Sequence, residues 1–228
     1  GYLESSSAAE TLFEVYPEDA RKKLRFIAIL REPVARDLSL YNMIRSMQKN
    51  PSDSPYQSYN EYSEITLYDY RKRNGREVGR EPKSNKRKHL RKGFYDEQLS
   101  QWWDVWGKEQ LLVLNYDTVV QNTSNTMQRV ADFLGLDASP WAGAELPHSN
   151  ELVSKKVKKE SIRDVDMPIC REVEQVFAPR VRHLYEMLSE AHADQLVPPQ
   201  QPPFPPFTDP CLEARQVKER RGRGEGEG

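Results

Sequence analysis

Residues 26–41 read FIAILREPVARDLSLY, and this stretch predicts the fold of the 228-residue chain. The run Leu24–Leu30 is short and almost entirely apolar, which is typical of a buried parallel strand. Arg31 and Glu32 end the run, and Pro33 suits the first position of a helix, where its missing N–H costs nothing. Apolar residues then recur at helical spacing, at Val34, Leu38, Tyr41 and Ile44. The stretch therefore predicts a strand, a charged turn and a helix.

Polar side chains in this unit form a candidate phosphate site. Arg31 follows the carboxyl end of the predicted strand, where α/β folds bind their ligands. Ser39 lies two turns into the predicted helix, with Arg36 between them. A guanidinium and a hydroxyl on adjacent elements can share one phosphate, through charge-assisted bonds of roughly 1.5–3 kcal/mol each. From spacing alone, the alternative stays open that Arg31 forms a surface ion pair and Ser39 is an exposed helix position.

The rest of the chain repeats the alternation of helices and strands. Helical spacing predicts amphipathic helices at 95–106 and 127–134, and a second buried strand is expected at Gln110–Leu114. A last helix begins near Asp166 and is expected to be interrupted at Pro179. This alternation predicts an α/β domain with a parallel sheet flanked by helices.

Two strands are too few for a sheet that stands alone, so we expect a further part of the sheet before Gly1. The chain also begins without Met, which we interpret as the mark of a fragment.

The composition predicts one folded domain and a tail. Hydrophobic residues make up 37% of the chain and charged residues 30%, which is enough for a core. From Val197 onward proline and charged residues dominate, so we expect a domain over 1–192 and a flexible tail over 193–228. Cys170 lies in a helical pattern and Cys211 in the expected tail, and the sequence leaves their pairing open.

A strongly basic block runs from Arg71 to Lys92, although the net charge of the chain is only −1. Both a solvated loop and an anion-binding surface fit such a block. Before it, Ser58 and Glu61 have capping-box spacing, which predicts the start of a short helix. A non-catalytic polyanion- or nucleic-acid-binding module that uses the basic block is the alternative function for the chain.

The stretch FIAILREPVARDLSLY resembles the 3′-phosphate-binding motif of sulfotransferases that use 3′-phosphoadenosine 5′-phosphosulfate (PAPS). In that motif a strand ending in L-R-[DE]-P-x-x-R is followed by S-x-Y. Other family motifs are similar to Gly1–Leu3, Ser58–Tyr62, Lys92–Trp102 and residues 111–136, in the order of the Golgi-type, heparan-sulfate-like carbohydrate enzymes.

The resemblance implies a P-loop NTPase-like sulfotransferase fold, incomplete at its N-terminus. It implies that Arg31, Arg36 and Ser39 bind PAPS. The basic run before the last helix, with Lys155, Lys156 and Lys158, is similar in place to a nucleotide loop of the heparan enzymes, although a solvated lysine run is the alternative.

The family's phosphate loop, K-x-G-[ST]-[ST], is absent from this sequence. The resemblance places that loop and the catalytic base before Gly1, so we expect no catalytic residue in this chain and no sulfate transfer by it alone. The implied mechanism is in-line displacement at sulfur, for which positioning and charge stabilisation suffice and no metal is needed.

The basic block lies where the family builds its acceptor cleft. We therefore expect an anionic polysaccharide or glycoprotein as the acceptor, bound by Lys86, Arg87, Lys88, Lys92 and Tyr95. A tyrosine-containing protein is the alternative acceptor, and no nucleic acid partner is expected. The resemblance also implies residence in the Golgi lumen, with any membrane anchor in the part before Gly1.

Overall fold

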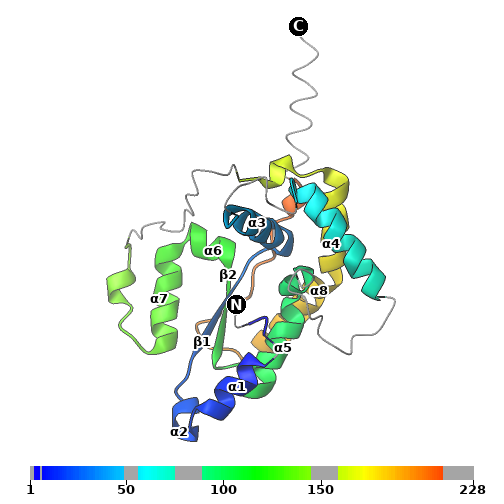
Figure 1. Ribbon diagram of the computed structural model, residues 1–228. Coiled ribbons are helices and arrows are strands. Elements are labelled where there is room, and N and C mark those ends of the chain that lie inside the picture. Colours follow the sequence, from blue (N-terminus) through cyan, green and yellow to red (C-terminus); the bar gives the residue numbers. More distant parts are fainter. Residues whose placement is uncertain (1–2, 6, 49–55, 75–88, 145–158, 213–228) are drawn as a thin grey trace. The chain divides into compact units, whose positions relative to one another are not determined.

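The computed structural model describes residues 3–5, 7–48, 56–74, 89–144 and 159–212 (Figure 1). The chain divides into two compact units. The first, here called the sheet unit, comprises Gly1–Arg31, Phe94–Glu151 and Arg180–Phe207. The second, the helical unit, comprises Glu32–Gly93, Leu152–Pro179 and Thr208–Gly228. No helix of the described part has both the length and the apolar character needed to cross a membrane.

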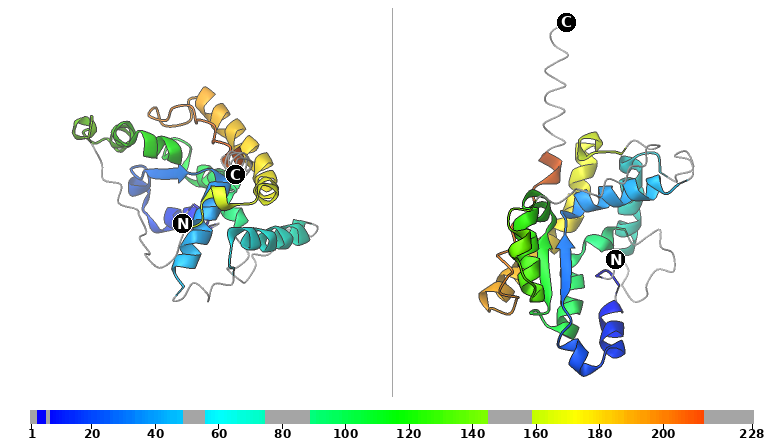
Figure 2. Two further views of the ribbon diagram at one scale, coloured as in Figure 1. Left: turned by 90° about the horizontal axis from the view of Figure 1, so that it is seen from above. Right: turned by 90° about the vertical axis from the view of Figure 1, so that its left-hand side faces the viewer.

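The sheet unit is built on two parallel strands, β1 (Phe26–Leu30) and β2 (Leu111–Asn115). Figure 2 shows the two strands side by side. Their register runs from Phe26 opposite Leu111 to Leu30 opposite Asn115. The sequence prediction of parallel strands is confirmed, and β2 begins one residue later than expected. The helices of this unit are α1 (Ala8–Val15), α2 (Glu18–Arg21), α5 (Tyr95–Trp106), α6 (Tyr116–Gln121) and α7 (Thr123–Leu134), with the 3₁₀ turn η4 (Ser139–Trp141).

One face of the sheet carries the main core. Ala28 and Leu30 of β1 pack there with α5, which contributes three tryptophans, and with the last turns of α8. The buried tryptophans are Trp102, Trp103 and Trp106. Each large side chain buried in this way contributes about 1.5–3 kcal/mol, so this core holds the strands and helices of the sheet unit together.

The opposite face of the sheet is covered over β2 and open over β1. Leu112 and Leu114 are buried with Phe133 of α7. Their register partners on β1, Ile27 and Ile29, remain 40% and 53% exposed. Within the described residues, this face therefore carries apolar side chains of β1 that no helix covers.

The helical unit begins with α3 (Pro33–Ser46), which buries Val34, Leu38 and Tyr41 as the sequence predicted. α4 (Tyr59–Asn74) starts where the capping-box spacing placed it, because the N–H of Glu61 donates to Ser58 Oγ at 3.2 Å. The predicted helix there was short, whereas α4 has 16 residues. The unit also contains η3 (Leu90–Gly93), η5 (Ile162–Asp164) and the first part of α8 (Met167–Ala193).

α8 is one helix of 27 residues, so the predicted interruption at Pro179 is wrong. A proline inside a helix costs about 3 kcal/mol through the lost hydrogen bond and the clash of its ring. Buried side chains lie on both sides of it, among them Val173 and Phe177 before Pro179 and Leu184 and Leu188 after it. Their burial outweighs that cost, at about 1.5–3 kcal/mol for each side chain.

The structure also differs from the flexible tail expected over 193–228, because several side chains between Val197 and Cys211 are packed. Val197 is buried, and the buried side chain of Gln201 accepts a hydrogen bond from Val113 N at 3.0 Å. Phe204 and Phe207 pack against the main core. Three apolar side chains and one buried amide therefore hold a segment whose composition suggested a solvated tail.

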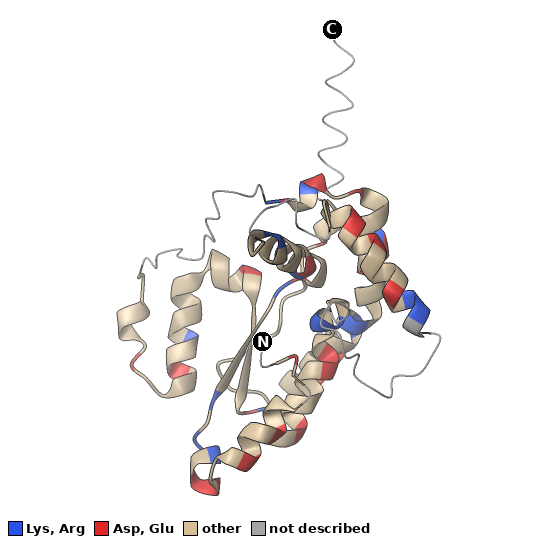
Figure 3. Ribbon diagram, in the orientation of Figure 1, with Lys and Arg blue, Asp and Glu red and all other residues tan. Residues whose placement is uncertain are grey.

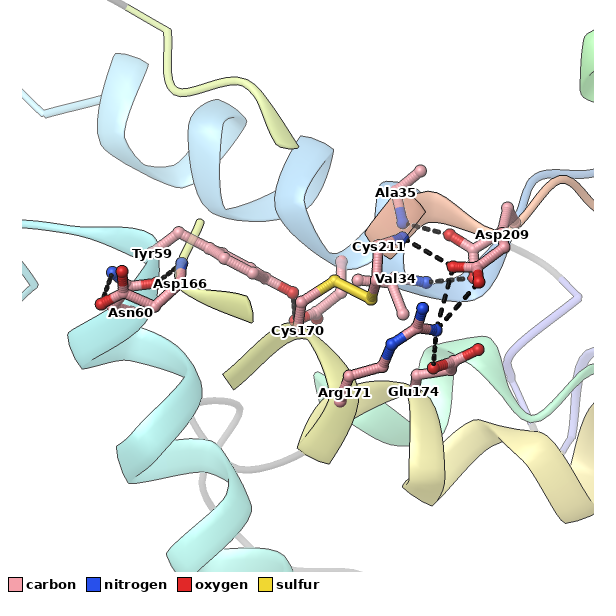
Figure 4. The surroundings of a disulfide bond; sticks show 12 residues. Val34, Ala35, Tyr59, Asn60, Asp166, Cys170, Arg171, Glu174, Asp209 and Cys211 are labelled. Atoms are coloured by element: carbon pink, nitrogen blue, oxygen red, sulfur yellow. Dashed lines mark hydrogen bonds and ion pairs between the residues drawn. A yellow bond between two sulfur atoms is a disulfide. The ribbon is translucent and has the colours of Figure 1, made fainter. Parts of the chain in front are cut away.

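A disulfide joins Cys170 of α8 to Cys211, settling a pairing that the sequence left open. The two Cα atoms are 5.9 Å apart, and both residues are fully buried. Figure 4 shows Arg171 beside this bond, where its guanidinium pairs with Asp209 at 2.9 Å and with Glu174 at 2.6 Å. The bond closes a loop of 41 residues, which stabilises the folded state by about 4 kcal/mol in the chain-entropy description.

Replacement of both cysteines by serine is therefore expected to lower the free energy of unfolding by about 2–4 kcal/mol. Urea unfolding of the wild type and of the Cys170→Ser, Cys211→Ser double variant, each with and without reductant, measures this. Reductant should bring the wild type to the stability of the double variant and leave the variant unchanged. Equal stability of the two proteins without reductant would contradict the structural role of the bond.

Candidate functional site

The carboxyl ends of β1 and β2 lie at the same edge of the sheet, because the register pairs Leu30 with Asn115. Arg31 leaves β1 at this edge, and Tyr116 leaves β2 there. This is the edge at which parallel α/β sheets bind ligands.

Arg31 is half-buried and held from two sides. Its guanidinium carbon lies 4.8 Å from the centroid of the Tyr116 ring, close enough for a cation–π contact. Its carbonyl oxygen accepts a hydrogen bond from the hydroxyl of Tyr95 at 2.9 Å. The backbone and the side chain of Arg31 are thus both positioned, whereas the sequence indicated only where the residue lies along the chain.

Tyr95 was predicted to bind the acceptor, and the structure shows it in another setting. Its side chain is buried, and its hydroxyl is engaged by the carbonyl of Arg31. This hydrogen bond holds the backbone of Arg31 at the edge of the sheet. A role in acceptor binding stays a prediction.

Asn115 and Tyr116 were missed as site residues by the sequence analysis. Asn115 Oδ1 accepts from the N–H groups of Asp117 and Thr118 at 2.8 and 3.4 Å, which caps α6. Its Nδ2 donates to Pro205 O at 3.3 Å. An asparagine directly after an apolar strand is an N-cap signal, so the start of α6 could have been predicted. The contact of Tyr116 with Arg31 could not, because the two residues are distant in the sequence.

On the helical unit, α3 presents the other two predicted nucleotide-binding residues. Ser39 is exposed and Arg36 is half-buried. They are three residues apart on the helix and are therefore neighbours on its surface. Arg31 belongs to the sheet unit, whereas Arg36 and Ser39 belong to the helical unit.

The first turn of α3 is capped by Glu32. Its carboxylate accepts from Val34 N at 3.0 Å and from Ala35 N at 2.6 Å. The acidic residue between Arg31 and Pro33 therefore satisfies the helix N-terminus from within the chain. This fixes where α3 begins, and thereby the positions of Arg36 and Ser39 along it.

Behind that surface, α3 carries a buried carboxylate, Asp37. Its two oxygens accept hydrogen bonds from the hydroxyls of Tyr59 and Tyr62, both at 3.1 Å. Burial raises the pKa of Asp37 from 3.8 to about 6, although the two hydrogen bonds and the nearby Arg36 act in the opposite direction. In the sequence this aspartate was indistinguishable from a solvated helix position.

Of the remaining predicted site residues, one lies in the described part of the chain and six lie outside it. Lys92 lies half-buried on the basic turn η3. Figure 3 colours the charged residues of the described part of the chain. The predicted acceptor residues Lys86, Arg87 and Lys88 and the predicted nucleotide-loop residues Lys155, Lys156 and Lys158 lie outside the described residues.

Among the described residues, Glu174, Asp209 and Cys211 are close enough to one another to be considered as metal ligands. Cys211 is in the disulfide, however, and Arg171 already pairs with both carboxylates. The group is therefore better described as an ion-pair cluster beside the disulfide.

A family model described as "Sulfotransferase domain" matches residues 10–170. This chain belongs to the sulfotransferase family. The matched residues include β1, α3 and β2, together with Arg31, Arg36, Ser39 and Asn115. No curated protein sequence matches this sulfotransferase chain.

A solved structure of a sulfotransferase from Alicyclobacillus acidocaldarius has a similar fold, with a TM-score of 0.56 and 18% sequence identity. The likeness covers 82% of this chain and 62% of the bacterial chain. This sulfotransferase chain thus spans less than two thirds of the length of its structural relative. The predicted α/β class and membership of the sulfotransferase family in general are confirmed, whereas the Golgi carbohydrate type and the P-loop-like fold stay predictions.

The buried Asp37 gives this sulfotransferase a pH dependence that can be measured. Its pKa is higher in the folded state than its ordinary value of 3.8, so the native protein holds more protons between about pH 4 and pH 6. Stability contributed by this group is therefore present at low pH and is lost as the pH rises through about 6.

An Asp37→Asn variant lacks this titration and keeps an oxygen that accepts from a tyrosine hydroxyl. Its stability relative to the wild type is expected to increase by roughly 2–3 kcal/mol between pH 4 and pH 7. Urea unfolding of both proteins at several pH values measures the difference. A difference that does not change with pH would show that Asp37 keeps its ordinary pKa.

Proposed function

We propose that this chain is the nucleotide-binding part of an enzyme that transfers a sulfuryl group from PAPS to a hydroxyl or amine of a glycan. The observation that carries the proposal is the placement of Arg31. It directly follows β1 at the carboxyl edge of a parallel sheet, and Tyr95 and Tyr116 position it there. The family membership supports sulfuryl transfer in general.

Arg31, Arg36 and Ser39 have the chemistry that the 3′-phosphate of PAPS requires. A guanidinium offers paired donors to phosphate oxygens, and the hydroxyl of Ser39 is exposed on α3. Each charge-assisted bond is worth roughly 1.5–3 kcal/mol. The 3′-phosphate distinguishes PAPS from ATP and other common adenine nucleotides, so these residues would select the donor.

In the proposed reaction the acceptor oxygen or nitrogen attacks the sulfur. The new bond to sulfur forms while the sulfur–oxygen bond to the 5′-phosphate breaks, and the acceptor loses its proton to a base. The residues described here bind and orient the nucleotide. We propose that the 5′-phosphosulfate grip and the base belong to a part of the enzyme outside this sequence.

The exposed face of β1 supports the proposal that a part of the enzyme lies outside this sequence. Ile27 and Ile29 are exposed, whereas their register partners on β2 are buried under α7. We propose that a further strand and helix cover β1 in the complete enzyme, as in a P-loop-type sheet. The coverage of only 62% of the bacterial relative agrees with such an additional part.

The acceptor and the compartment are proposed on separate grounds. The basic block 71–92 suits an anionic polysaccharide or glycoprotein, since many weak contacts with sulfate or carboxylate groups add up. The buried disulfide between Cys170 and Cys211 suits an oxidising compartment such as the Golgi lumen.

The nucleotide site is tested by the affinity of the full-length enzyme for 3′-phosphoadenosine 5′-phosphate (PAP), with adenosine 5′-phosphate as the nucleotide that lacks the 3′ group. The wild type should prefer PAP, and Arg31→Ala should weaken PAP binding about 10–100-fold without changing the affinity for adenosine 5′-phosphate. Arg31→Lys is the matched control, because it keeps the charge and loses the paired donors. Equal affinity of the wild type for the two nucleotides would refute the site.

The acceptor site is tested by charge reversal. Lys86→Glu, Arg87→Glu and Lys88→Glu, combined in the full-length enzyme, should raise the acceptor KM several-fold. The KM of this variant should also rise less steeply with salt concentration than the KM of the wild type. The affinity for PAP should not change. An unaltered acceptor KM would assign the basic block to something other than the acceptor.

A further inference from the structure

One asparagine of the chain meets the sequence requirement for N-glycosylation. Residues 122–124 read Asn-Thr-Ser, which fits the acceptor triplet Asn-x-Ser/Thr. None of the other eight asparagines fits it, because Asn50 is followed by proline and the rest lack a hydroxyl residue two positions on. Such a triplet also occurs by coincidence in many proteins, so the structural setting of Asn122 has to decide whether it suits a glycan.

Asn122 lies at the corner between α6 and α7 of the sheet unit, and it caps α7 (Figure 1). The residue is exposed, as are Val120, Gln121 and Asn125 around it. Val120 is an apolar residue that remains 43% exposed. The corner therefore offers solvent-exposed surface for a bulky, polar modification, which would also shield Val120.

The fold uses every polar atom of Asn122 except its amide nitrogen. The backbone N–H donates to Thr118 O at 2.9 Å, and the carbonyl accepts from Thr126 N at 3.0 Å and from Thr126 Oγ1 at 2.9 Å. The side-chain Oδ1 accepts from Asn125 N at 3.4 Å. Within the described part of the chain, Nδ2 has no hydrogen-bond partner. Because N-glycosylation takes place at Nδ2, it would leave all the hydrogen bonds of this corner in place.

The disulfide is an independent indication of the compartment that such a modification requires. N-glycosylation occurs in proteins that pass through the secretory pathway, where the lumen is oxidising. The buried bond between Cys170 and Cys211 is typical of the same compartment. It belongs to the helical unit, whereas the triplet belongs to the sheet unit, so two separate features of the chain point to one environment.

The hydroxyl of the triplet is engaged in the folded protein. Ser124 Oγ donates to Trp141 O and accepts from Gly143 N at 3.0 Å. These contacts tie the first turn of α7 to the segment around η4. A transferring enzyme that has to recognise this hydroxyl therefore meets it only before α7 and η4 come together, which places the modification during synthesis of the chain.

We infer that Asn122 is N-glycosylated at Nδ2. The donor is an oligosaccharide carried on a lipid pyrophosphate. A bond forms between Nδ2 and the anomeric carbon of the first sugar, the bond from that carbon to the pyrophosphate oxygen breaks, and Nδ2 loses one proton to the transferring enzyme. The inference goes beyond the proposed function and shares with it only the oxidising compartment.

The test is mass spectrometry of the full-length enzyme produced in a eukaryotic cell line. Peptide:N-glycosidase releases the glycan and converts a glycosylated asparagine to aspartate. The peptide with Asn122 should carry the glycan before this treatment, and aspartate at position 122 should appear only after it. Ser124→Ala should abolish the modification although Asn122 is still present, whereas Ser124→Thr should keep it.

Two further variants serve as controls for folding. Asn122→Asp cannot be glycosylated and keeps an oxygen that caps α7, so its affinity for PAP should equal that of the wild type. Asn125→Asp changes an exposed asparagine of the same helix outside the triplet and should keep the glycan. Ser124→Ala also loses the contacts with Trp141 and Gly143, so Asn122→Asp remains the decisive variant if Ser124→Ala fails to fold.

The outcomes separate this inference from the proposed function. An unmodified Asn122 in the full-length enzyme overturns the inference, whether or not the bond between Cys170 and Cys211 has formed. Affinity for PAP is measured on the same preparation. Preference for PAP together with an unmodified Asn122 overturns the inference alone, and a glycan at Asn122 without preference for PAP overturns the proposed nucleotide site alone.

Discussion

The parallel pairing of β1 with β2 is the constraint on which the sheet unit depends. Its register brings the strand ends at Leu30 and Asn115 to one edge, so that Arg31 and Tyr116 emerge close enough for their side chains to touch. A slip by one residue would turn the Ala28 side of β1 away from the tryptophan core. The position of Arg31 is therefore a consequence of how the apolar side chains of two strands are buried.

In the helical unit, α3 is fixed by three carboxylates that differ in how their charge is compensated. Glu32 accepts from two backbone N–H groups at the first turn, and Glu160 pairs with an arginine and accepts two further hydrogen bonds. Asp37 accepts from two tyrosine hydroxyls and lies near Arg36, and burial nevertheless raises its pKa. Glu32 fixes where α3 begins, Asp37 ties the helix to α4, and Glu160 ties it to the segment before η5, so α3 forms a firm support for Arg36 and Ser39.

The proline-rich C-terminal segment protects the outer edge of β2 without becoming a strand. Prolines lack the N–H groups that a ladder of hydrogen bonds requires, so repeated pairing of the segment with β2 is disfavoured. The side chain of Gln201 accepts a hydrogen bond from Val113 N, and the carbonyl of Pro205 accepts one from the side chain of Asn115. An edge strand covered in this way is shielded from pairing with other chains.

The sequence by itself determined the local elements and the family. Short-range patterns sufficed for this: the apolar run before Arg31, the proline after it, the helical spacing of α3 and α5, and the motif in FIAILREPVARDLSLY. Only the tertiary structure decided the rest, because it depends on residues that are distant along the chain. Burial by remote side chains keeps α8 continuous through Pro179, packs the segment that resembled a tail and raises the pKa of Asp37. The disulfide between Cys170 and Cys211 and the hydrogen bonds between Asn42 and the backbone of Glu160 likewise form only once the chain has folded. No local pattern determines which distant groups will meet.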